Sequence, residues 1–189
     1  MTTRSRAQRG AVTRRFPRLG SGLLVLVALG CAAGDLGPGG GAGGRLGTGD
    51  EADFRLASLE GGELGPGDFP DRVVLVEFWA TWCVPCHAQA AILADLHPEV
   101  AADGVAFLAV DVGEERDQVA RFVASSPFPY PVLLDPESRL ADSLGVYSLP
   151  TLMVVDPRGR IAYLDDGVHT AEELRRILRE AREAAPAAG

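Results

Sequence analysis

Runs of apolar residues alternate with segments of helical spacing along most of this 189-residue chain. The apolar runs are typical of strands covered on both faces and lie at residues 73–79, 105–110, 132–134 and 151–155. The segments between and after these runs predict helices at residues 84–96, 119–123, 138–144 and 170–181. Elements in this order predict an α/β fold with a mixed central sheet and helices on both sides.

Two hairpins complete the predicted sheet. Residues 54–56 and the turn at 60–63 indicate a short N-terminal β-hairpin before the first long strand. The later turn Asp156-Pro157-Arg158-Gly159 has Asp first, Pro second and Gly fourth, as a type I turn prefers. We therefore expect the strands at 151–155 and 160–164 to pair antiparallel.

The first 50 residues differ in composition from the rest of the chain. They carry seven Arg against Asp35 and Asp50, a net charge of +5, which leaves −13 on the remaining 139 residues. An acidic folded part argues against nucleic acid as a partner. Gly is the most frequent residue within 32–51, so we expect a flexible tether there, followed by one domain at 52–185 and a disordered tail at 186–189.

Residues 1–31 have the three-part layout of an export signal. An Arg-rich stretch ends at Arg18, an apolar run follows at 23–29, and small residues come next. The apolar run is shorter than the roughly 20 residues of an ordinary membrane span. Cys31 directly follows Gly30 and resembles the acceptor cysteine of bacterial lipoproteins, so we expect lipidation at Cys31 and a membrane-anchored, extracytoplasmic protein. The alternatives are a cysteine removed with the signal and a cysteine within an uncleaved anchor.

Cys83 and Cys86 carry the candidate chemistry, because they lie where an apolar strand gives way to a helix. Free N–H groups and the helix dipole stabilise a thiolate at a helix N-terminus, so Cys83 is the expected nucleophile. Cys86, about one turn later, can attack the mixed disulfide and release the substrate. Glu77 in the apolar strand is the candidate proton acceptor, since burial would raise its pKa toward neutrality. The alternative is a Glu77 that reaches water at a strand end.

Several motifs in order resemble the membrane-anchored thioredoxin-like oxidoreductases called TlpA-like or ResA-like. They span about residues 53–183 and include the run from Trp82 to Cys86, Leu133 to Pro136, Gly145 to Thr151, the turn from Asp156 to Gly159 and the final helix. The resemblance implies a thioredoxin-like fold in which Cys83 attacks and Cys86 resolves. It also implies a cis bond before Pro150, beside the cysteines.

The same resemblance assigns substrate contacts. Leu149, before the cis proline Pro150, would offer backbone groups to an extended substrate chain. Trp82 would form the rim beside the dithiol, with partial core packing as its alternative. Pro85 fits reducing members of the family better than strong oxidants. His87 takes the place of a thioredoxin Lys, and we expect it to be an exposed helix residue.

The implied function is that of an exported thiol-disulfide oxidoreductase, a disulfide reductase of envelope proteins. Its substrates would be protein disulfides, and the family most often suggests maturation of c-type cytochromes. A separate redox partner would re-reduce the dithiol. No metal or organic cofactor is implied.

Other functions remain as alternatives. The run from Cys83 to His87 also matches the attachment pattern of c-type haem, but Met153, the most obvious distal ligand, falls in a predicted core strand. A zinc site at the same residues lacks a fourth ligand, since His97 and His169 stand alone in the sequence. A peroxiredoxin-like peroxide reductase would share the scaffold, but its usual Pro-x-x-x-Thr-x-x-Cys setting is missing. A chaperone-like binding module would keep client binding after loss of Cys83.

Overall fold

The computed structural model of this chain describes residues 45–184. The predicted export signal, Cys31 and the tail at 186–189 lie outside the described residues. Within the described part, no helix combines the length and the apolar character that crossing a membrane requires.

The described end of the predicted tether, residues 45–51, contacts the domain. The Leu46 N–H donates a hydrogen bond to the Ser143 carbonyl at 2.8 Å. Glu51 pairs with Arg160 in an isolated β-bridge. The folded unit therefore includes residues before the predicted boundary at 52, because backbone hydrogen bonds hold them against it.

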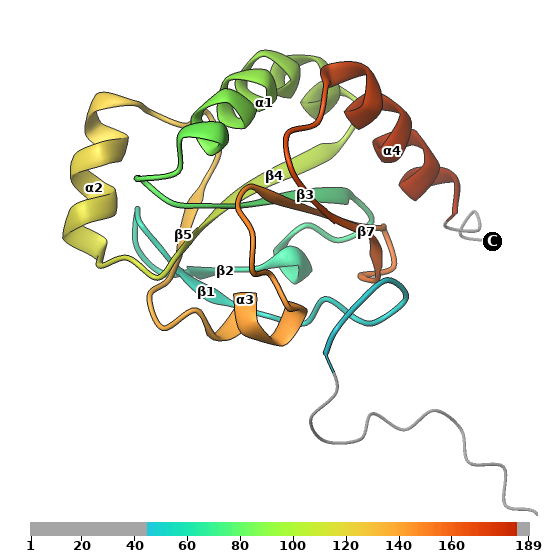
Figure 1. Cartoon of the computed structure of the whole chain (residues 1–189). Helices are drawn as coiled ribbons and strands as arrows, with labels where there is room; N and C mark the ends of the chain where they lie inside the picture. The colour runs from blue at the N-terminus through green and yellow to red at the C-terminus, as the bar shows by residue number, and fades with distance from the viewer. Residues whose placement is uncertain (1–44, 185–189) are drawn as a thin grey trace, which may run out of the picture. The chain divides into compact units, whose positions relative to one another are not determined.

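One mixed sheet forms the centre of the domain (Figure 1). In chain order, the strands are β1 (Leu56–Ser58), β2 (Glu63–Leu64), β3 (Val73–Trp79), β4 (Val105–Val112), β5 (Val132–Asp135), β6 (Thr151–Val155) and β7 (Ile161–Asp166). They are ordered β2-β1-β5-β4-β3-β6-β7. β4 pairs in parallel with β3 and β5, and the other pairs are antiparallel. The mixed sheet and both predicted hairpins are confirmed.

Helices cover both faces of the sheet. They are α1 (Val84–Ala102), α2 (Arg116–Ser125), α3 (Arg139–Leu144) and α4 (Ala171–Glu183), with a short 3-10 helix η1 (Pro66–Asp68). One apolar cluster joins the odd-numbered apolar residues of β3 to α1, α2 and α4, and a second joins the even-numbered residues to α3. Figure 1 shows α1 and α4 on the side of the sheet opposite α3. Cys83 and Cys86 belong to the first cluster, so the candidate chemistry lies on the α1 face.

Helix α1 runs beyond its predicted end near residue 96. It passes through Pro98 and ends at Ala102. Val100 is buried on the same face as Leu93. The extra turn therefore continues the apolar face against the sheet.

Candidate active site at the start of helix α1

Four residues, from Ala80 to Cys83, connect β3 to α1. The Cys83 N–H donates to the Ala80 carbonyl at 3.1 Å, so the connection contains a tight turn. Cys83 is the N-cap residue of α1, and its Sγ accepts a hydrogen bond from the Cys86 N–H at 3.3 Å. The structure thus places Cys83 at a helix N-terminus, as the sequence predicts.

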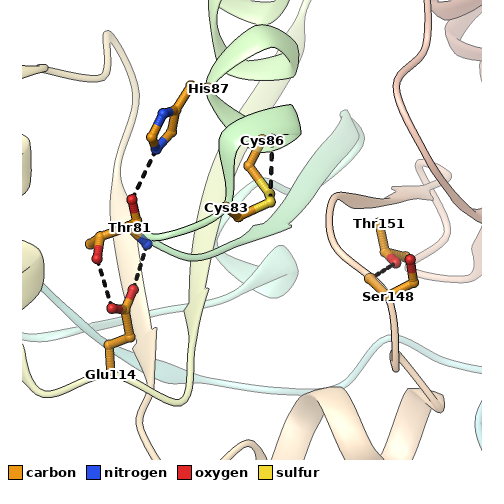
Figure 2. Close-up of a disulfide and its surroundings, with 7 residues drawn as sticks. All are labelled: Thr81, Cys83, Cys86, His87, Glu114, Ser148 and Thr151. Carbon is orange, nitrogen blue, oxygen red and sulfur yellow. Dashed lines mark hydrogen bonds between the residues drawn. A yellow bond between two sulfur atoms is a disulfide. The ribbon is translucent and has the colours of Figure 1, made fainter.

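Cys83 and Cys86 are joined by a disulfide bond of 2.02 Å (Figure 2). Both are buried, with 3% and 1% of their surface exposed. The neighbouring Trp82 and Val84 are 68% and 75% exposed, and Pro85 is also exposed. Exposed apolar side chains therefore border a buried disulfide, and Trp82 lies on the rim instead of in the core.

The segment before β6 lies at the same end of the sheet as the cysteines. Thr151 of β6 is paired with Phe78 of β3, so Pro150 lies next to the end of β3 from which the cysteine turn departs. The Leu149–Pro150 peptide bond is cis, as the resemblance implies. Leu149 packs on the apolar cluster that contains both cysteines.

Glu77 lies in the middle of β3, fully buried between β4 and β6. Its position in the strand directs it to the α1 face, the face that holds Cys83 and Cys86. Neither carboxyl oxygen has a hydrogen-bond partner among residues 45–184. Burial raises the pKa of Glu77 from 4.5 to about 8. The structure therefore agrees with the buried interpretation of Glu77 and not with the water-exposed one.

Tyr130 is a buried neighbour of this carboxyl. Its hydroxyl has no hydrogen-bond partner in the described part of the chain. Burial, and next the charge of Glu77, raise the pKa of Tyr130 above its usual range. The phenol therefore stays protonated near neutral pH. Of Tyr130 and Glu77, only Glu77 can exchange a proton in this range.

Gln89 is a buried polar residue of α1 that the sequence analysis did not single out. Its Oε1 accepts a hydrogen bond from the His169 N–H at 2.6 Å, and the His169 ring contacts the Gly167 carbonyl. The Gly167 N–H donates in turn to the Pro150 carbonyl at 2.8 Å. This chain of contacts ties α1 to the cis-proline segment. The spacing in the sequence could have indicated Gln89, because it lies three residues after Cys86 and therefore on the same helix face.

A second group that the sequence analysis missed surrounds Thr81, in the turn before Cys83. The carboxylate of Glu114 accepts hydrogen bonds from both the N–H and the hydroxyl of Thr81 (Figure 2). Glu114 follows the end of β4, which pairs in parallel with β3. Residues that follow neighbouring parallel strands meet at the same edge of a sheet, and this was the signal available in the sequence.

An apolar pocket of about 300 Å³ opens beside Cys86. Its walls include Ala90 and Ala94 of α1, Phe122 of α2 and Phe128 from the following loop. Cys86 therefore borders an apolar surface on the α2 side of α1.

The side chains considered for the zinc and haem alternatives pack within the domain. His97 packs against the rings of Phe107 and Tyr130, at centroid distances of 5.1 and 5.5 Å. His169 contacts the Tyr163 hydroxyl at 2.8 Å, and Met153 is fully buried in β6. Among residues 45–184, no group of three or more His, Cys, Asp or Glu side chains is arranged as a metal site.

Comparisons with known proteins give a family match and named relatives. The AhpC/TSA family matches residues 48–164. Thiol-disulfide oxidoreductase ResA of Geobacillus thermodenitrificans is 32% identical over 126 residues, which are 67% of this chain and 72% of the relative. ResA of Bacillus subtilis is 31% identical over 64% of this chain and 68% of its own length.

Solved structures give the same result. A putative thiol:disulfide interchange protein DsbE from Chlorobium tepidum superposes with a TM-score of 0.66 and 26% identity, covering 72% of this chain and 99% of that chain. A secreted thiol-disulfide isomerase from Corynebacterium glutamicum superposes with a TM-score of 0.63 and 28% identity, covering 70% and 84%. The chain is therefore similar in sequence and in structure to proteins that exchange thiols and disulfides.

Proposed function

Since the chain belongs to the TlpA/ResA-like family of thioredoxin-like thiol-disulfide oxidoreductases, we propose that it reduces disulfides of exported proteins through Cys83 and Cys86. One observation carries the assignment of roles. Cys83 begins α1, and the Cys86 N–H is directed at its sulfur at 3.3 Å. In the reduced protein the same N–H group and the positive end of the helix dipole would stabilise a thiolate at Cys83.

The exchange proceeds in two steps. The Cys83 thiolate attacks one sulfur of a substrate disulfide, and a new S–S bond joins Cys83 to the substrate. The other substrate sulfur leaves as a thiolate and takes a proton from solvent. Cys86 then loses its proton and attacks the Cys83 sulfur, which releases the remaining substrate sulfur. The substrate gains two electrons, and the protein is left with the Cys83–Cys86 disulfide.

Glu77 is the proposed proton carrier for Cys86. Its carboxyl group is buried, has no competing hydrogen-bond partner among the described residues, and lies on the face that holds both cysteines. With a pKa of about 8, it is mostly protonated at pH 7. It can therefore donate a proton when Cys86 is the leaving group, as the enzyme disulfide is reduced. In the opposite direction, the ionised form accepts the proton of Cys86.

The substrate would bind across the cis-proline side of the dithiol. Leu149, which precedes the cis proline Pro150, would offer backbone groups to an extended chain. The exposed Trp82 side chain would supply apolar contact beside the dithiol, and Pro85 is exposed next to the cysteines.

The location follows from the sequence. We propose that residues 1–31 direct export and that lipidation at Cys31 anchors the protein to a membrane. A similar solved structure is described as secreted, which supports an extracytoplasmic site of action. Cytochrome c maturation and general maintenance of envelope thiols are the candidate pathways, and a separate dithiol protein would re-reduce the pair. A Cys31→Ser variant should leave the membrane fraction, and its retention there would favour an uncleaved anchor.

A trapping experiment tests the function. The full chain with Cys86→Ser should accumulate mixed disulfides between Cys83 and its clients in exporting cells, because no resolving thiol remains. Mass spectrometry of the adducts gives both client identity and the direction of electron flow. Cys83→Ser is the matched control and should trap nothing. Absence of adducts in the Cys86→Ser strain would refute the proposal, and peroxide consumption by the wild type without a protein disulfide would favour the peroxide-reducing alternative.

A further inference from the structure

The backbone of Thr81 is held by a buried carboxylate from a distant segment. Glu114 is only 6% exposed. Its Oε2 accepts a hydrogen bond from the Thr81 N–H at 2.5 Å, and its Oε1 accepts one from the Thr81 hydroxyl at 2.7 Å. Figure 2 shows both bonds converging on one side of the turn that leads to Cys83.

Two further side chains complete this arrangement. The Thr81 carbonyl can only accept a hydrogen bond, so the His87 Nε2 at 3.0 Å carries the proton. The His87 ring, exposed as expected, stacks on Phe122 of α2 at a centroid distance of 5.0 Å. Gln118 of α2 donates from its Nε2 to the Oε1 of Glu114. We call Glu114, Gln118 and His87 together the Thr81 clamp.

We propose that Glu114 is a positioning residue for disulfide exchange, acting through Thr81 to fix where Cys83 sits at the start of α1. The inference rests on the proposed attack by Cys83. Thr81 is the first central residue of the turn that the Cys83 N–H closes on the Ala80 carbonyl. Rotation of its backbone would therefore displace the Cys83 sulfur relative to the first turn of α1.

The remaining turn residue cannot supply the same restraint. Trp82 is 68% exposed, so packing contributes little to its position. Attack on a disulfide requires the sulfur atoms to be aligned, and a displacement of about 1 Å in such a reaction can cost about a hundredfold in rate. Hydrogen bonds to Thr81 are thus the means by which this structure restrains the turn.

The side chain of Glu114 does not cap α2, the helix that follows it. The N-cap residue of α2 is Glu115, and no side-chain capping bond forms there. Glu114 instead reaches across to a turn 33 residues earlier in the chain. Burying a carboxylate is costly unless it receives hydrogen bonds, and its oxygens receive them from Thr81 and Gln118.

Asp111, three residues before Glu114, is a second buried carboxyl group near the Thr81 clamp. It is fully buried in β4, and burial, followed by the neighbouring Glu114, raises the pKa of Asp111 to about 8. Asp111 therefore keeps its proton at pH 7, and the hydrogen-bond donors of this region, from Thr81 and Gln118, are directed at Glu114.

Single-turnover kinetics of the full, reduced chain with insulin at pH 7 test the proposal. Glu114→Ala should slow the attack of Cys83 on the insulin disulfide by about tenfold. Glu114→Gln should fall between this variant and the wild type, because an amide oxygen can still accept one of the Thr81 bonds. Glu115→Ala is the matched control: it removes the same charge from the next, exposed position and should stay within about twofold of wild type. A rate for folded Glu114→Ala within twofold of wild type would overturn the proposal.

A double-mutant cycle separates positioning from general stability. Thr81→Val keeps the N–H and the shape but removes the hydroxyl, so it should slow the wild type and have little further effect in Glu114→Ala, which has no side-chain acceptor left for that hydroxyl. If the double variant slowed the attack of Cys83 by the product of the two single-variant factors, the proposal would be overturned, since Glu114 would then act through another contact. If Glu114→Ala does not fold, the comparison of Glu114→Gln with Glu115→Ala still tests whether Glu114 affects the rate of attack by Cys83. A wild type that fails to reduce insulin refutes the proposed function, whereas an active wild type with unaffected variants refutes only the role of Glu114.

Discussion

Replacing Glu77 by Gln should remove a large part of the pH dependence of stability. Glu77 titrates at a pKa of about 8 in the folded protein and at 4.5 in the reference state, because burial disfavours its charged form. Between these two values the unfolded chain releases the proton while the folded chain retains it. The contribution of Glu77 to stability is therefore complete below pH 4.5 and is lost as pH rises towards 8.

The expected size follows from the two pKa values of Glu77. Ionisation in the unfolded state lowers the free energy of unfolding by about 1 kcal/mol at pH 5 and by about 3 kcal/mol at pH 7. The wild type should thus lose about 2 to 3 kcal/mol more than Glu77→Gln between these pH values. The variant leaves a buried amide at the same site, and the cost of that amide does not change with pH, so it cancels in the comparison.

The measurement is urea unfolding of the oxidised full chain at pH 5, 6, 7 and 8. Wild type and Glu77→Gln are compared at each pH, because the other titrating groups then contribute equally to both proteins. A difference between the two proteins that stays constant within about 0.5 kcal/mol would refute the reasoning, given the extrapolation error of such data. Glu77 would then titrate as a solvated carboxyl and could not hold a proton for Cys86 at neutral pH.

Three further predictions concern groups away from the sulfur atoms. Asp111→Asn should also flatten the fall in stability between pH 5 and 7, because the folded pKa of Asp111 is raised from 3.8 to about 8, and an unchanged slope in urea unfolding would contradict this. Leu93→Ala should lower the free energy of unfolding by about 2 to 5 kcal/mol, since Leu93 is fully buried in α1, and a loss below about 1 kcal/mol would show that the site collapses around the smaller residue. Thr170→Ala should cost about 1 kcal/mol by removing the capping box with Glu173 that begins α4, and an unchanged thermal midpoint would argue against that cap.

The sequence identified the elements of the site because each has a local physical signature. The apolar run of β3 and the helical segment after it placed Cys83 at a helix N-terminus, where the structure has it as the N-cap residue. Burial of Glu77 followed from its place inside an apolar run. The cis bond before Pro150 came from the family resemblance alone, since no local property of the chain distinguishes this proline from the others.

The order of the elements places Thr81 and Glu114 at the same edge of the sheet, but their specific contact could not be predicted, because it depends on the register of two strands. β3 and β4 pair in parallel with Val73 opposite Val105, an offset of 32 residues. This offset brings the turn at Thr81 beside the residues that follow β4, and a shift by one position would direct different side chains towards the turn. Apolar runs covered on both faces carry no alternation that fixes such a register.

Three buried carboxyl groups, those of Glu77, Asp111 and Glu114, are of two kinds, and the difference bears on how a thiolate can form at the cysteines. Glu114 receives hydrogen bonds from Thr81 and Gln118, whereas Glu77 and Asp111 have no hydrogen-bond partner among the described residues and hold protons at pH 7. An ionised Glu77 would repel a thiolate at either cysteine, because like charges interact strongly in a buried site. A thiolate would in turn raise the pKa of Glu77 further, so the proton stays in the site until a sulfur takes it. A stable thiolate and a nearby proton can therefore coexist on this face, and this requires the Glu77 carboxyl group to be buried within β3.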